Sequence, residues 1–164
     1  MRYFSGLVRM DFKNILFYAL FVAATACGTH ASKSEDELVQ TLNTYMVKVN
    51  ENHTLGETVV EGALTDNKGQ NDIGSFTYYV NYNKDTKDLC HIKNIEKTNQ
   101  TREEHYYYKN NTLVTVLVNA SASSDKKIYI NKGRIISSLN IAPEEQDLLL
   151  AKGERFLKEY KQTH

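Results

Sequence analysis

Several residue types that build small secreted scaffolds are scarce or absent in this sequence: its 164 residues include two cysteines, one proline and no tryptophan. Two cysteines form at most one disulfide, so a scaffold held together by several disulfides is not indicated. An excess of one charge is also lacking, because 20 Lys and Arg residues balance 20 Asp and Glu residues. A nucleic-acid-binding domain, which gathers positive charge on one face, is therefore not indicated.

Long apolar runs are lacking as well. The run Ile15–Ala26 has 12 residues, and as a helix it would span about 18 Å, short of the roughly 30 Å hydrocarbon core of a bilayer. Its flanks are typical of a secretory signal, because Arg2, Arg9 and Lys13 precede it and small residues end it. We therefore interpret this segment as a signal peptide, with Met10 as an alternative start.

The four residues Ala24-Thr25-Ala26-Cys27 resemble the lipobox of bacterial lipoproteins in a degenerate form, with Ala24 where leucine is usual. The resemblance implies that the Cys27 thiol takes a diacylglycerol, as in palmitate-bearing lipoproteins, and anchors the mature protein to a membrane. In Gram-negative lipoproteins an aspartate after this cysteine often marks the inner membrane, so Gly28 favours the outer membrane. The alternatives are cleavage by ordinary signal peptidase, which gives a soluble periplasmic or secreted protein, and an uncleaved apolar helix.

Lipidation of Cys27 would leave Cys90 as the remaining thiol. Cys90 lies in the strand-like segment Leu89–Ile92, and we interpret it as a small buried residue and not as a nucleophile. If the protein is soluble instead, a disulfide between Cys27 and Cys90 is an alternative.

The chain divides into a leader, a tether and one domain. Residues 1–26 form the signal peptide, and residues 27–33 are small and polar, as expected for a flexible link between lipid and protein. Residues 34–164 suffice for a single domain with its own core. Without the leader, which contains three Lys or Arg residues and one Asp, the chain is slightly acidic.

Two amphipathic helices are expected, one at each end of this domain. The first begins with the capping box Ser34–Glu37 and continues to about Asn50. The second begins at Pro143, whose fixed φ suits the first helical position, and continues to about Lys161. Its apolar stripe contains Gly153, which costs up to about 1 kcal/mol relative to Ala, so we infer close packing against the sheet there.

Between the helices the apolar period changes to two and turn residues become frequent, which is typical of an antiparallel meander. The fold class is therefore α+β, with an N-terminal helix, a curved antiparallel β-meander of about seven strands, and a C-terminal helix packed on the sheet. The expected strands are Leu55–Leu64, Ser75–Tyr82, Leu89–Glu96, Glu103–Lys109, Thr112–Asn119, Lys126–Asn131 and Arg134–Leu139.

The hairpin that turns at Asn110-Asn111 has apolar or aromatic residues on both faces. A two-residue turn at these asparagines aligns Tyr108 with Leu113 and His105 with Val116. Because both faces are apolar, we expect this hairpin to be central and covered on two sides, with a sheet that curls into a concave surface.

His91 and His105 lie on neighbouring expected strands, where two imidazoles could form a metal pair. A loop centred between residues 99 and 100 places His91 opposite Tyr108 and His105 opposite Asn94, which leaves the two rings out of line. We therefore expect no metal and no cofactor.

Tyrosine is the most informative residue type of the domain, since seven of the 11 tyrosines lie in the expected strands. Their simplest interpretation is β-propensity. A tyrosine also combines an apolar ring with a polar tip, as binding surfaces prefer. The candidate ligand or partner surface consists of Tyr78, Tyr106, Tyr108 and His105.

No G-x-S-x-G, H-E-x-x-H, C-x-x-C, P-loop or dinucleotide-binding motif occurs in the sequence. The sequence therefore favours a lipid-anchored cell-envelope protein with a non-catalytic binding or structural role, whose partner is a protein or a small ligand. One alternative is a small enzyme of the curved-sheet type with His105 as acid or base in a cavity. Another is a membrane-tethered immunity or inhibitor protein.

Overall fold

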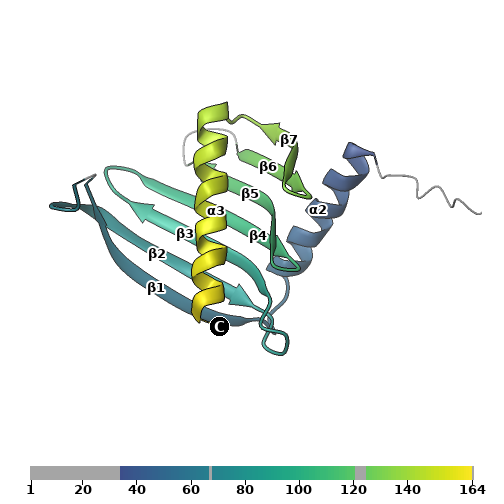
Figure 1. The fold of residues 1–164 in the computed structure, drawn as a ribbon, viewed down its shortest axis with the longest axis horizontal. Helices are drawn as coiled ribbons and strands as arrows, with labels where there is room; N and C mark the ends of the chain where they lie inside the picture. Colours follow the sequence, from purple (N-terminus) through teal and green to yellow (C-terminus); the bar gives the residue numbers. More distant parts are fainter. Residues whose placement is uncertain (1–33, 67, 121–124, 164) are drawn as a thin grey trace, which may run out of the picture. The chain divides into compact units, whose positions relative to one another are not determined.

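The computed structural model describes residues 34–66, 68–120 and 125–163, and in these ranges two helices flank seven strands (Figure 1). This order confirms the predicted α+β class. The predicted signal peptide, Cys27 and the tether lie outside the described residues. No helix in those ranges is long and apolar enough to cross a membrane. The elements are α2 (Glu35–Asn50), β1 (Gly56–Thr65), β2 (Asp72–Tyr82), β3 (Leu89–Lys97), β4 (Thr101–Lys109), β5 (Thr112–Ala120), β6 (Lys126–Asn131), β7 (Arg134–Leu139) and α3 (Pro143–Thr163).

Helix α2 begins at the predicted capping box. The Ser34 hydroxyl accepts a hydrogen bond from the Glu37 N–H at 3.2 Å, and the Glu37 carboxylate accepts one from the Ser34 N–H at 3.3 Å. Both bonds satisfy amides that would otherwise be unpaired at the helix start. Leu42 and Met46 are buried, so the predicted apolar stripe of this helix faces the sheet.

The seven strands pair in chain order, so β1 and β7 form the two edges of the sheet. Asn110 and Asn111 have φ angles of 52° and 54°, in the left-handed region that asparagine tolerates, and they make the predicted tight turn between β4 and β5. The strand ends agree with the predicted ones within three residues.

The predicted register of the central hairpin is correct beside the turn and wrong beyond it. Tyr108 pairs with Leu113, but a β-bulge then follows, with one extra residue in β5. As a result Leu117, and not Val116, lies opposite His105. A bulge exchanges the faces of all residues that follow it, so Val116 points to the opposite side from the predicted one.

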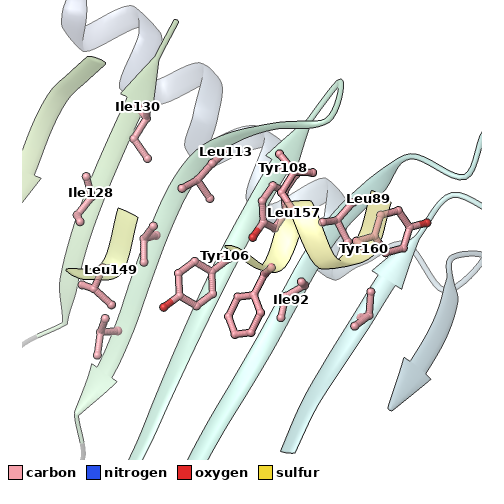
Figure 2. Close-up of a cluster of buried hydrophobic side chains, with 14 residues drawn as sticks. Leu89, Ile92, Tyr106, Tyr108, Leu113, Ile128, Ile130, Leu149, Leu157 and Tyr160 are labelled. Carbon is pink, nitrogen blue, oxygen red and sulfur yellow. The ribbon is translucent and has the colours of Figure 1, made fainter. Parts of the chain in front are cut away.

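The two helices cover opposite faces of the sheet, which we name the α3 face and the α2 face. On the α3 face, Tyr106 and Val116 belong to the same core cluster as Phe156 of α3. Figure 2 shows Tyr106 of this cluster together with Leu157 of α3. On the α2 face, Tyr107 packs in a second cluster with Leu42 of α2. The central hairpin is therefore covered on two sides, as its two apolar faces predict.

Helix α3 approaches the sheet most closely at Gly153. A Cβ atom at this position would lie 2.7 Å from Cδ2 of Leu113 and 3.0 Å from Cδ1 of Tyr106. The Gly153 carbonyl also accepts a hydrogen bond from the Tyr108 hydroxyl at 2.8 Å. The close packing predicted from a glycine in mid-helix is confirmed.

A buried carboxylate fastens α3 to the sheet. The side chain of Glu104 in β4 is 2% exposed, and it accepts a hydrogen bond from Lys152 of α3 at 2.7 Å. Arg102 and Tyr106 donate to the same carboxylate at 2.6 Å and 2.8 Å, and Arg102 also reaches Glu145 of α3 at 3.1 Å. Burial raises the pKa of Glu104, but Lys152 and the other donors outweigh it and hold the pKa below its ordinary value. The carboxylate is therefore charged at neutral pH.

Candidate functional site

A groove runs along α3 on the side of strands β1 and β2. It exists because α3 packs mainly on β5 and β3 and leaves part of the first two strands uncovered. One part of the groove is a hollow of about 230 Å³ with mostly apolar walls. Small-molecule sites combine apolar walls with a few polar groups, so this hollow is the candidate site. Its lining residues are Thr58, Val60, Tyr78, Val80, Ile92, Phe156, Glu159, Tyr160 and Thr163.

Two glycines of β1 shape the floor of this groove. Gly56 pairs with Tyr82, and Gly62 pairs with Phe76. A Cβ atom at either glycine would lie 2.6 Å from a ring carbon of its partner, so the missing side chain lets each ring lie across the edge strand. Between these two pairs, Thr58 and Val60 of β1 and Tyr78 and Val80 of β2 line the hollow.

Tyr78 offers a hydroxyl group to the groove. Its ring packs on Phe156, with 5.2 Å between ring centroids. In the part of the chain that the structure describes, the Tyr78 hydroxyl makes no hydrogen bond, whereas the hydroxyls of Tyr106 and Tyr108 both donate one within the core. Burial raises the pKa of Tyr78, and the charge of Glu159 acts in the same direction. The phenol therefore stays protonated and provides a hydrogen-bond donor in apolar surroundings.

The groove becomes more polar next to this hollow. A second hollow of about 360 Å³ shares Tyr78, Phe156 and Glu159 with the first. Lys152 and Arg155 also line it, and both are already paired with carboxylates. A ligand in the groove would therefore meet an apolar pocket at one end and a rim of paired charges at the other.

The four residues of the predicted binding surface do not share one surface. Tyr106 and Tyr108 are fully buried beneath α3, where they build the core (Figure 2). Tyr78 lines the groove, and His105 lies on the α2 face of the sheet. Cys27, the predicted lipidation site, lies outside the described residues.

His91 and His105 are in contact, so the prediction that their rings are out of line is wrong. The register of β3 and β4 differs from the predicted one by a residue, and His91 pairs with Tyr107 while His105 pairs with Lys93. The histidines are thus diagonal neighbours on one face. Nε2 of His91 lies 3.0 Å from Nδ1 of His105, with 12° between the ring planes.

Carboxylates at both ends of this chain of side chains fix where the protons lie. Asn81 donates its Nδ2 hydrogen to Glu57 at 3.0 Å, so its Oδ1 accepts a hydrogen bond from Nδ1 of His91 at 3.1 Å. Nε2 of a neutral His91 is then an acceptor, for which Nδ1 of His105 must be the donor. Nε2 of His105 lies 2.8 Å from the Glu103 carboxylate and 3.4 Å from the side-chain nitrogen of Asn119.

Burial, together with the neighbouring His105 and Lys93, lowers the pKa of His91 to about 3. His91 is therefore neutral at physiological pH. Both nitrogens of His105 are engaged, so neither is free to take a proton from a substrate. Among the described residues, no three His, Cys, Asp or Glu side chains gather where they could hold a metal ion.

Cys90 is a free, partly buried cysteine whose Sγ lies 3.5 Å from the Asp88 carbonyl oxygen. Burial raises the pKa of its thiol, so the uncharged form prevails at neutral pH. A nucleophilic cysteine needs the thiolate. The geometry therefore agrees with a structural role for Cys90.

Sequence reasoning found Tyr78 but missed the glycine–aromatic pairs that flank the hollow. The signal lies in the pairing of β1 with β2, which sets Gly62 opposite Phe76 and Gly56 opposite Tyr82. A glycine opposite an aromatic residue predicts a ring that lies flat over the neighbouring strand. This pattern can be read from a sequence only when the register of the two strands is known.

Comparison with protein-family models, with curated proteins and with solved structures found no match for this chain. Its function therefore has to be inferred from the groove and from the sequence.

Proposed function

We propose that this chain is a lipid-anchored cell-envelope protein that binds a small ligand, without catalysis, in the groove between α3 and strands β1 and β2. The observation that supports binding is the apolar hollow lined by Tyr78, whose hydroxyl makes no hydrogen bond within the described residues. The observation that supports anchoring is the lipobox-like segment that ends at Cys27, and Gly28 after it favours the outer membrane.

The groove indicates the chemistry of the ligand. Apolar walls favour an apolar body, because burial of apolar surface drives association. The Tyr78 hydroxyl favours a ligand with a hydrogen-bond acceptor at its level, since an unmatched polar group in a buried site costs free energy. The paired charges of Lys152 and Glu96 at the polar end suit an uncharged or solvated tail.

Among the described residues, the candidate acid, base and nucleophile are already hydrogen-bonded or are held uncharged. The nitrogens of His105 are both hydrogen-bonded, and the Glu104 carboxylate is surrounded by donors. The Cys90 thiol is held uncharged by burial. These three groups weigh against the alternative of an acid, base or nucleophile waiting in a cavity.

Two matched probes test the binding proposal: 4-phenylbutan-2-one, which has a carbonyl acceptor, and n-butylbenzene, which has none. We expect the wild type to bind the ketone more tightly than Tyr78→Phe does, by about threefold to tenfold, the value of one hydrogen bond. n-Butylbenzene should bind both proteins equally. Equal affinity of the ketone for the two proteins would contradict the role of Tyr78, and no binding of either probe would contradict the groove as a site.

Intact-mass spectrometry tests the anchoring proposal. The protein recovered from the cell envelope should begin at Cys27 and have the added mass of a diacylglycerol, whereas Cys27→Ala should lack it. An unmodified native protein with a complete leader would contradict the proposal.

A further inference from the structure

We propose that the free edge of β1 recognises an extended peptide whose residues alternate between basic and apolar, and that the peptide adds to the sheet as an eighth strand beside the groove. The proposal rests on the proposed binding role of the groove and names the class of partner. Addition of a strand to an open edge is an established mode of peptide recognition, in which main-chain hydrogen bonds give affinity and side-chain pockets give specificity.

The edge of β1 is long and open. The strand Gly56–Thr65 has ten residues, and among the described residues its hydrogen-bonded neighbour in the sheet is β2 alone. Proteins usually protect such an edge with lysine, proline, a covering element or a very short strand. β1 contains neither lysine nor proline, and Val59 at its middle is 47% exposed.

Side chains of β1 alternate between two different surroundings. Thr58 and Val60 point to the α3 face and line the apolar hollow. Glu57, Val59 and Glu61 point to the α2 face, because successive residues of a strand point to opposite sides. A strand added beside β1 alternates in the same way, so its residues would face the hollow and the acidic side in turn.

The acidic side requires positive charge from a partner. The Glu57 carboxylate accepts a hydrogen bond from the Asn81 amide at 3.0 Å, and the Glu61 carboxylate accepts one from the Thr77 hydroxyl at 3.4 Å. Both donors are neutral, and within the described residues neither carboxylate has a salt bridge. Two uncompensated negative charges thus stand four residues apart on the same side of an open edge.

A second copy of this chain fits the edge poorly in the antiparallel register centred on Val59. If two β1 strands paired antiparallel about Val59, Glu57 of each copy would lie opposite Glu61 of the other. Like charges directly opposite each other destabilise a strand pair. Lysine or arginine at these positions would instead form opposite-charge pairs, which selects a basic strand as the partner.

The probe is an acetylated, amidated nine-residue peptide that alternates lysine and valine. We expect it to bind at least about tenfold more tightly than a peptide that alternates glutamate and valine, because two cross-strand charge pairs change sign. Two N-methylated versions of the probe test the backbone hydrogen bonds. One is methylated on the backbone nitrogen of every valine, and the other on the backbone nitrogen of every lysine. In a strand each set of nitrogens points to one edge, so one version should lose about tenfold or more and the other should keep its affinity. Equal affinity of the two versions, whether kept or lost, would overturn the proposal.

A charge reversal on the protein completes the test. The Glu57→Lys/Glu61→Lys variant should bind the lysine peptide more weakly and the glutamate peptide more tightly than the wild type does. It should still bind 4-phenylbutan-2-one, since these two residues do not line the hollow. Asp147→Lys/Glu154→Lys changes the net charge equally at exposed positions of α3 that do not line the groove, and this variant should still bind both the lysine peptide and the ketone. If the Glu57→Lys/Glu61→Lys variant binds the peptides as the wild type does and also binds the ketone, the strand proposal is overturned and the groove proposal stands. Absence of binding by both probes would overturn both.

Discussion

Glu104 illustrates how a single residue connects the sheet to α3. Its carboxylate is buried and charged, and its partners Lys152 and Arg102 come from α3 and β4. Removal of Glu104 takes one of two carboxylate partners from Lys152 and from Arg102, and it leaves the buried Tyr106 hydroxyl without its acceptor. Sequence alone indicates only a neighbouring pair of acids at Glu103 and Glu104, because the partner on α3 is 48 residues away.

We predict that Glu104→Ala lowers the free energy of unfolding by about 3 kcal/mol. The exposed Asp147→Ala should change it by less than about 0.5 kcal/mol. Urea denaturation monitored by circular dichroism measures both. A loss at Glu104 no larger than that at Asp147 would contradict the role of the carboxylate.

The stabilisation that Glu104 provides should depend on pH, and the direction follows from its pKa. The folded pKa of Glu104 is held below its ordinary value, so the unfolded chain binds a proton more readily. The stabilisation is therefore complete above the unfolded value of about 4.3 and is lost as the pH falls through the lower folded pKa. We expect the difference in unfolding free energy between wild type and Glu104→Gln to shrink below about pH 4.

His91 provides a second prediction at the residue scale. Its folded pKa of about 3 is far below the value of about 6.5 in an unfolded chain, so its contribution to stability is lost as the pH falls from about 6.5 towards 3. Nitrogen-15 NMR of the ring should show His91 neutral and protonated at Nδ1 down to about pH 4, the limit set by that pKa. Titration of His91 near pH 6.5 would contradict the hydrogen-bond chain.

At the scale of elements, the sequence predicts where helices and strands lie and fails where pairing depends on packing. The capping box at Ser34 and the proline at Pro143 mark the helix starts correctly. The β-bulge beside Tyr108 leaves no local signal in the sequence, because the turn at Asn110-Asn111 indicates only the pairs next to it. The missed bulge put Val116 on the wrong face, and a register error of one residue concealed the contact between the histidines.

The close approach of α3 to the sheet predicts how a substitution at Gly153 changes the stability of the protein. Gly153→Ala should gain up to about 1 kcal/mol of helix propensity but lose more through overlap with the buried Leu113 and Tyr106 side chains. We expect a net loss of about 1 kcal/mol. In a Leu113→Ala background the overlap with the nearest atom is gone, and the same change should become stabilising.

Thermal unfolding of the four proteins in this double-mutant cycle separates packing from propensity. The exposed Ala151→Gly, on the same helix, should cost about 1 kcal/mol through propensity alone. A Gly153→Ala change that stabilises the protein with Leu113 intact would show that the helix does not approach the sheet so closely.

At the scale of the whole described domain, one helix on each face explains the composition of the central strands. Because both faces of the β4–β5 hairpin are apolar, the sequence predicts that an element packs on each face. In the structure these two elements are α3 and α2. The position of the groove could not be predicted in this way. It depends on how far α3 extends over β1 and β2, which is decided by long-range contacts at Gly153 and Glu104.

The central claim is that the α3 face beside β1 and β2 receives the ligand. Adjacent residues test it directly, because Val60 lines the hollow while Val59 points to the opposite face. In a methyl carbon-13 NMR titration with 4-phenylbutan-2-one, the account predicts shifts at the methyl groups of Val60, Val80 and Ile92, with Val59 and Ile95 unchanged. Shifts at Val59 and Ile95 without shifts at Val60, or no saturable shift at any of these methyl groups, would contradict it.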